Sequence, residues 1–278
     1  ARRKEGFASL VAIFSFLGIM LGVATLIVTM AVMNGVKIEL IERIIGINSH
    51  ISVGSYGGKG IEDYRNLTAK IKKVNGVTNV TPSVHGQVLG VFPNTNRGLM
   101  VRGVTKQDLK DKKIISHNIV QGNIFEEKTF QAIAGIRLAK NTGTSTGKTI
   151  KMISPNFNPT LFGNIPRMKD FEVSGIFDVG MFEYDSSVIF TNLKAAQIFF
   201  NMKDKVNIIE IEVENPQDLE AVKKEILSFL ERDKYYLTDW RKANEGFIES
   251  INVQSNVLFL ILALIILVAA FNVISGMV

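Results

Sequence analysis

Two long uncharged stretches lie near the ends of the chain, and between them charged and apolar residues alternate. Residues 6–36 contain no Asp, Glu, Lys, Arg or Pro, and residues 250–278 contain no charged side chain. At about 1.5 Å per residue, each stretch is long enough as a helix to cross a hydrocarbon core of about 30 Å. We therefore predict two transmembrane helices, with residues 1–5 as a cytoplasmic flank and residues 37–249 as a domain between the spans.

The basic start of the chain predicts its orientation. A secretory signal peptide also begins with basic residues, but its apolar core has only about 7–15 residues and ends at a small-residue cleavage site. Arg2, Arg3 and Lys4 flank the first span, and positive charge near a span favours the cytoplasm. The central segment is then expected on the far side of the membrane. Because the chain begins with Ala1 and ends inside an apolar stretch, we expect it to be part of a longer membrane protein.

The central segment mixes two hydrophobic periods, which predicts an α+β domain. Residues 206–214 contain a strict alternation of apolar and acidic residues, typical of a half-buried strand whose glutamates Glu210, Glu212 and Glu214 form a solvated face. A helix is expected over residues 61–74, with one apolar face made of Ile61, Tyr64, Leu67, Ile71 and Val74.

A second helix is expected after that strand. Asn215 and Pro216 have the residue types of a helix cap and first turn, and Leu219, Val222, Ile226 and Phe229 recur as a buried stripe. Short strands are predicted at residues 49–54, 77–84, 87–92, 99–103, 130–134, 148–154, 169–177 and 188–190.

Composition narrows the class of protein. The chain is 46% hydrophobic with a mean hydropathy of +0.20, too apolar for an ordinary soluble domain. The segment 37–249 has a net charge of only +4 and no dense Lys/Arg stripe, which disfavours nucleic-acid binding. The absence of cysteine excludes disulfides, thiolate metal sites and a cysteine nucleophile.

No catalytic or metal site is predicted. Residues 143–149 resemble a phosphate-binding loop, but the glycine spacing is one residue short and a strand-like segment follows, so we interpret them as a turn. His50, His85 and His117 have no carboxylate or second histidine at helical spacing, which favours surface or core roles. We predict a non-catalytic protein without metal or cofactor.

Two features of the first helix suggest contacts. Gly18 and Gly22 form a small-xxx-small pair that lets another helix approach closely, although glycine is also common in membrane spans. Met33, Val36 and Leu40 continue an apolar stripe beyond the predicted span. This stripe either packs in a core or meets lipid acyl chains.

Residues 154–167 carry the most distinctive pattern of the central segment. They contain Pro155, Pro159 and Pro166, three of only six prolines in the chain, between two strand-like segments. Proline removes amide donors and stiffens the chain, so the hairpin can protrude without pairing to copies of itself. With its apolar tips, this hairpin, here called the hook, is either a docking element or a loop folded over its own sheet.

Several segments together resemble the lipoprotein-releasing permeases LolC and LolE. The resemblance lies in residues 15–24, 31–35, 39–40 and 135–139, in the hook, and in residues 240–241 and 268–272. It implies a four-span subunit of an ABC transporter of the MacB-like class in the bacterial inner membrane, with a periplasmic domain between the first two spans. A second LolC/LolE-type permease subunit, a separate ATPase subunit, membrane lipid, a lipoprotein substrate and the periplasmic chaperone LolA are the implied partners.

The resemblance also implies roles for particular residues. The hook would grip LolA, with Arg167 and Lys169 as flanking charges, and the cavity for lipoprotein would include Val28, Met33, Val36 and Leu40. The hook residues are Pro155, Phe157, Pro159, Leu161, Phe162, Ile165, Pro166 and Arg167.

Because hook and cavity motifs occur together, a LolC-type, a LolE-type and a hybrid subunit all remain open. The alternatives to lipoprotein release are a MacB- or FtsX-like mechanotransmission permease and a membrane-tethered structural or sensor domain.

Overall fold

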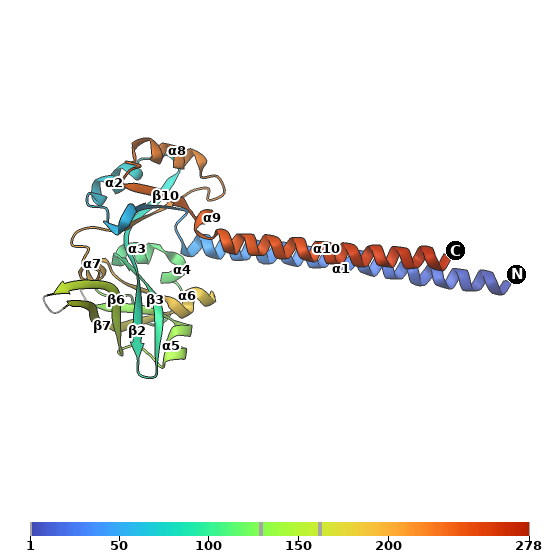
Figure 1. The fold of residues 1–278 in the computed structure, drawn as a ribbon, viewed down its shortest axis with the longest axis horizontal. Helices are drawn as coiled ribbons and strands as arrows, with labels where there is room; N and C mark the ends of the chain where they lie inside the picture. Colours follow the sequence, from blue (N-terminus) through green and yellow to red (C-terminus); the bar gives the residue numbers. More distant parts are fainter. Residues whose placement is uncertain (1, 128–129, 161–162, 278) are drawn as a thin grey trace. The chain divides into compact units, whose positions relative to one another are not determined.

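The computed structural model describes residues 2–127, 130–160 and 163–277, which form two units (Figure 1). One unit contains the chain up to Arg43 and from Arg241 onward, and the other contains Ile44–Trp240. The first unit is helical. The second is the α+β domain that the alternating periods predict.

The helical unit consists mainly of α1 (Arg2–Ile47) and α10 (Glu245–Met277). By length and composition, both are candidates for crossing a membrane. The first helix continues well past the predicted span because no proline or glycine pair interrupts its second half. The short helix α9 (Trp240–Ala243) precedes α10.

A closed ring of six strands forms the larger part of the domain. Each strand pairs with the next in the order β2, β3, β8, β5, β7 and β6, and β6 pairs again with β2. The pairing therefore closes into a barrel, to which β4 adds at the edge of β7. The strands are β2 (Val77–Phe92), β3 (Thr95–Val104), β4 (Ile119–Gly122), β5 (Gln131–Gly135), β6 (Thr149–Thr160), β7 (Gly163–Phe177) and β8 (Val188–Asn192).

A second, smaller sheet shares β2 with the barrel. The first half of β2 pairs with β9 (Ile208–Val213), and β1 (Ile51–Ser55) lies between β9 and β10 (Tyr235–Asp239). The helices α2 (Tyr64–Ile71) and α8 (Glu220–Phe229) lie on this side of the domain (Figure 1). One long strand thus belongs to two sheets.

Apolar side chains from the barrel strands and α7 (Leu193–Phe199) form the main core. Phe171 packs edge-to-face against Phe130 and Phe199, and Phe177 packs in the same way against Phe190. The remaining helices are α3 (Lys106–Asp111), α4 (Lys113–Ser116), α5 (Ile136–Thr142), α6 (Phe182–Ser187) and the 3₁₀ turn η1 (Tyr56–Gly58).

The structure corrects some predicted boundaries. The expected helix at 61–74 shortens to α2, although Ile61 and Val74 remain buried beside it. The strands expected at 77–84 and 87–92 are one continuous strand, β2.

The predicted cap at Asn215 and Pro216 is wrong. The helix α8 begins at Glu220, and the Asn215 side chain instead accepts a hydrogen bond from the amide of Gln217 in a turn. Asn215 fits that role because its short side chain readily bonds the backbone two residues later.

Candidate functional site

The hook is the far end of the hairpin formed by β6 and β7. Pairing continues outward from Ser154–Arg167 to Thr160–Gly163, with an irregularity between Ser154 and Phe157. Residues Leu161 and Phe162 lie outside the described residues, as do the side chains of Phe157 and Pro159. The hook is therefore a strand hairpin, as its prolines and flanking strand patterns predict.

At the base of the hook, three apolar side chains occupy one row across neighbouring strands. Leu89 on β2 pairs with Ile153 on β6, which pairs with Met168 on β7. Leu89 is 42% exposed, Met168 is 57% exposed, and Ile165, closer to the tip of the hook, is 49% exposed. Leu89, Ile153 and Met168, here called the apolar row, form an apolar strip across the sheet, whereas Ile165, three residues from Met168 on the same strand, faces the other side of the hairpin.

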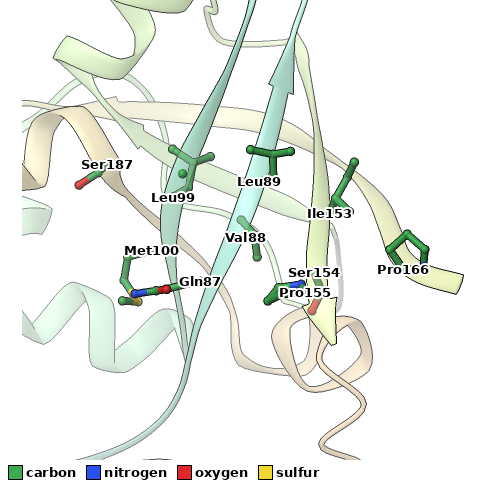
Figure 2. A pocket seen from close by; sticks show the side chains of 11 residues that line it. Gln87, Val88, Leu89, Leu99, Met100, Ile153, Ser154, Pro155, Pro166 and Ser187 are labelled. Carbon is green, nitrogen blue, oxygen red and sulfur yellow. The ribbon is translucent and has the colours of Figure 1, made fainter. Parts of the chain in front are cut away.

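A groove of about 750 Å³ adjoins the apolar row (Figure 2). Its lining comes from β2, β3, β6 and β7, with Ser187 from α6, and Pro155 and Pro166 border it on the hook side. Figure 2 shows Leu89 and Ile153 on neighbouring strands at this groove. The other lining residues are Gln87, Val88, Gly98, Leu99, Met100, Ser154 and Ser187.

The predicted flanking charges lie on β7. The ammonium group of Lys169 lies 4.3 Å from the ring centroid of Phe130, which is a cation–π contact. Arg167 is half-buried and pairs across the hairpin with Ser154.

In the helical unit, α1 and α10 pack side by side in opposite directions. The ammonium group of Lys37 donates to the side-chain oxygen of Asn252 at 2.8 Å. A Cβ on Gly22 would lie 3.6 Å from Ile266, whereas one on Gly18 would have no described atom within 4 Å. Of the predicted glycine pair, Gly22 faces α10 within the chain, and Gly18 is exposed.

The predicted cavity residues divide between two sides of α1. Met33 and Leu40 are half-buried and lie at helical spacing from Lys37, on the side that meets α10. Val28 and Val36 are exposed. Their role in holding lipoprotein remains a prediction.

A buried polar network lies elsewhere in the domain, and sequence patterns alone do not predict it. The ammonium group of Lys112, between α3 and α4, contacts the carboxylate of Glu210 on β9, and both side chains are almost fully buried. His85 on β2 places its Nε2 atom 3.0 Å from the other carboxylate oxygen of Glu210. The expectation that Glu210 belongs to a solvated face is therefore wrong.

Local charges control protonation in this network. Burial raises the pKa of Glu210, but the charge of Lys112, the hydrogen bond from His85 and the charge of Arg102 more than reverse this, so its pKa lies well below the ordinary value. Burial also lowers the pKa of His85, and the contact with Glu210 compensates only in part. A neutral His85 ring with its proton on Nε2 donates to the ionised Glu210.

The other candidate sites keep structural roles. Gly143 ends α5 in the left-handed conformation and residues 146–147 form a turn before β6, so the loop-like motif is a turn, as predicted. His50 accepts a hydrogen bond from the amide of Val213. Within the described ranges, no group of three His, Asp or Glu side chains is arranged to hold a metal ion.

Comparison with known proteins shows the class of protein to which the chain belongs. The model of the MacB-like periplasmic core domain family matches residues 12–229, so the chain is a membrane protein with a domain of this class between two candidate membrane helices. It is 30% identical over 282 residues to the lipoprotein-releasing system transmembrane protein LolC of Neisseria meningitidis serogroup B, covering 100% of this chain and 67% of the relative.

Further relatives carry both names of the same system. The LolC protein of Xylella fastidiosa (strain Temecula1) is 28% identical over 280 residues, and the LolE protein of Haemophilus influenzae is 25% identical over 284 residues. Each alignment covers 100% of this chain and 67% of the relative. The chain belongs to the LolC/LolE family of transmembrane permease subunits.

Proposed function

We propose that this chain carries the first two spans and the periplasmic domain of a permease subunit that extracts lipoproteins from the bacterial inner membrane. The names of its relatives, which belong to lipoprotein-releasing systems, support this substrate. Two candidate membrane helices around a MacB-like periplasmic core domain support the membrane location. ATP hydrolysis then takes place on a separate ABC subunit, and a second LolC/LolE-type subunit completes the permease.

The hook serves as the docking element for the periplasmic chaperone LolA. The observations that carry this proposal are the apolar row at the base of the hook and the exposed side chain of Ile165 on the hook itself. A soluble carrier that covered Leu89, Ile165 and Met168 would remove apolar surface from water, which favours association. The stiff hairpin limits the ordering cost of binding.

The apolar stripe of α1 serves as the surface that meets lipoprotein acyl chains. Val28 and Val36 are exposed, while Met33 and Leu40 lie against the α10 side. Acyl chains bind by burial of apolar area and need no polar partner, so the exposed apolar side chains of Val28 and Val36 suit them.

Two other functions use similar architecture. A MacB- or FtsX-like permease that only transmits mechanical work, or a tethered sensor, has no need for a chaperone-binding hook. The sequence relatives favour lipoprotein release, because the LolC and LolE proteins match the whole chain.

Chaperone capture tests the docking role directly. We expect the full chain with Ile165→Asp and Met168→Asp to retain less than a tenth of the immobilised LolA that the parent captures, because both charges enter an apolar contact. Ile198→Asp on α7, where the side chain is 63% exposed, is the matched control and should leave capture unchanged. Equal capture by the hook variant and the parent would remove the docking role.

A further inference from the structure

The last turn of α1 lies inside the folded domain. Ile44 is 3% exposed and Ile47 is fully buried, so this end of the helix is part of the core. The final carbonyl groups of a helix lack partners within the helix and carry partial negative charge. A cation beside these carbonyl groups donates hydrogen bonds to them and balances their partial negative charge.

Two cations from different parts of the domain lie at this helix end. The ammonium group of Lys112 lies 3.4 Å from the carbonyl oxygen of Ile47, and the guanidinium group of Arg102 on β3 lies 3.5 Å from the same oxygen. Arg102 also donates to the side-chain oxygen of Asn48 at 2.8 Å. The side-chain amide nitrogen of Asn48 in turn donates a hydrogen bond to the phenol oxygen of Tyr184 on α6.

Glu210 extends these contacts into the two sheets. Its carboxylate receives Lys112 on one oxygen and His85 on the other. Glu210 lies on β9 of the small sheet, while His85 lies on β2 just beyond the segment that pairs with β9. The end of α1 is thereby tied to the strand that belongs to both sheets.

The chemistry of the pair indicates a role other than stability. Removing two charges from water costs several kcal/mol per ion, and apolar pairs of similar volume often stabilise a core equally well. A hydrogen-bonded ion pair differs from an apolar pair in that it has one preferred geometry. It can therefore fix the direction of a helix end as well as bury it.

We propose that Lys112 and Glu210 form a latch that holds the last turn of α1 to β9 and β2, so that displacement of α1 is passed to the domain. Without the latch, residues 44–50 would absorb the displacement by local opening. The use of this latch during transport rests on the proposed function, but the latch itself is a property of the domain.

Hydrogen exchange of the full chain in detergent tests the latch. In Lys112→Met/Glu210→Leu, we expect the amides of residues 44–50 to exchange at least tenfold faster than in the parent. The amides of β8, where every residue is buried, should be unchanged. Arg65→Met/Asp204→Leu removes an exposed bidentate ion pair of the same domain and should leave both segments unchanged.

The remaining outcomes also decide the question. Unchanged protection of residues 44–50 in the double variant would overturn the proposal. If that variant loses protection throughout the domain, Lys112→Gln/Glu210→Gln keeps polar side chains of similar size and should expose residues 44–50 alone. General loss of protection in both variants would show that the pair holds the whole domain, which also contradicts a latch. Because no lipoprotein or chaperone is present, the result is independent of the proposed function.

Discussion

Lys112 and Glu210 are 98 residues apart in the sequence, yet their charged groups are in direct contact inside the domain. Lys112 comes from the junction of two short helices, and Glu210 comes from a strand with alternating apolar and acidic residues. Their contact joins the end of a long, candidate membrane-spanning helix to the sheets. Several properties of the domain should depend on it.

The ion pair should show strong coupling in unfolding measurements. Lys112→Met alone leaves Glu210 buried without its cation and should lower the free energy of unfolding by about 3–5 kcal/mol. Lys112→Met/Glu210→Leu should cost less, because no uncompensated charge remains. The fluorescence of Trp240, the single tryptophan and a buried one, reports this unfolding in the full chain. Additive losses would argue against the coupling.

Two partly buried histidines should destabilise the domain as the pH decreases below neutrality. Burial holds the pKa of His85 and of His50 below the ordinary value of 6.5, so the unfolded chain binds more protons below that pH. The two histidines should therefore contribute a decrease in the free energy of unfolding from about pH 7 to pH 5, by no more than about 1.4 kcal/mol per pH unit for each, while Asp108, Asp185 and Glu212, whose pKa values burial raises, contribute with the opposite sign. Urea titrations across this range provide the measurement.

The variant His85→Gln should reduce this pH dependence, because glutamine does not titrate. Glu210 contributes at lower pH: its stabilisation is complete above the ordinary pKa of 4.5 and is lost as the pH falls through its lowered folded value. An identical slope between pH 7 and pH 5 in the parent and in His85→Gln would contradict the role of this histidine.

Close packing of α7 on the barrel should make one glycine of β3 intolerant of substitution. A Cβ on Gly103 would lie 2.2 Å from the Cβ of Ala196, so Gly103→Ala should lower the free energy of unfolding by about 1–3 kcal/mol. Gly98 lies on the same strand with no described atom within 4 Å of such a Cβ. Gly98→Ala should change stability by less than about 0.5 kcal/mol, and equal effects would contradict this packing.

Photocrosslinking should trap lipoprotein on α1. Crosslinkers at Val28 and Val36, where the side chains are exposed, should give adducts with lipoprotein in membranes that contain the whole transporter. A crosslinker at Ile198 on the domain should give none. Equal yields at all three positions, or adducts at Ile198 alone, would remove the proposed cavity.

Patterns along the chain predict much of the architecture. The two long helices follow from uncharged stretches, and most strands follow from alternation, because both signals depend on neighbours within one element. The hook follows from its three prolines. The strand β10 carries little alternation, and its five residues are all half-buried, so it gives no such signal.

Features that depend on distant partners could not be predicted. The apolar row requires the register of β2 against β6, which places Leu89 beside Ile153. Alternation in β9 correctly separates two faces, but it does not show that Lys112 and His85 cover the acidic face at Glu210. No carboxylate lies at helical spacing from His85, so its sequence neighbours do not predict its partner Glu210, which comes from another strand.

Release of lipoprotein from spheroplasts tests the central claim, that this subunit passes its substrate to a carrier held at the hook. Cells that carry the complete transporter with Ile165→Asp/Met168→Asp should release at least tenfold less lipoprotein to added LolA than parent cells, while ATP hydrolysis by the purified complex continues. Release at the parent rate, in cells where Ile198→Asp also behaves as the parent, would contradict the claim.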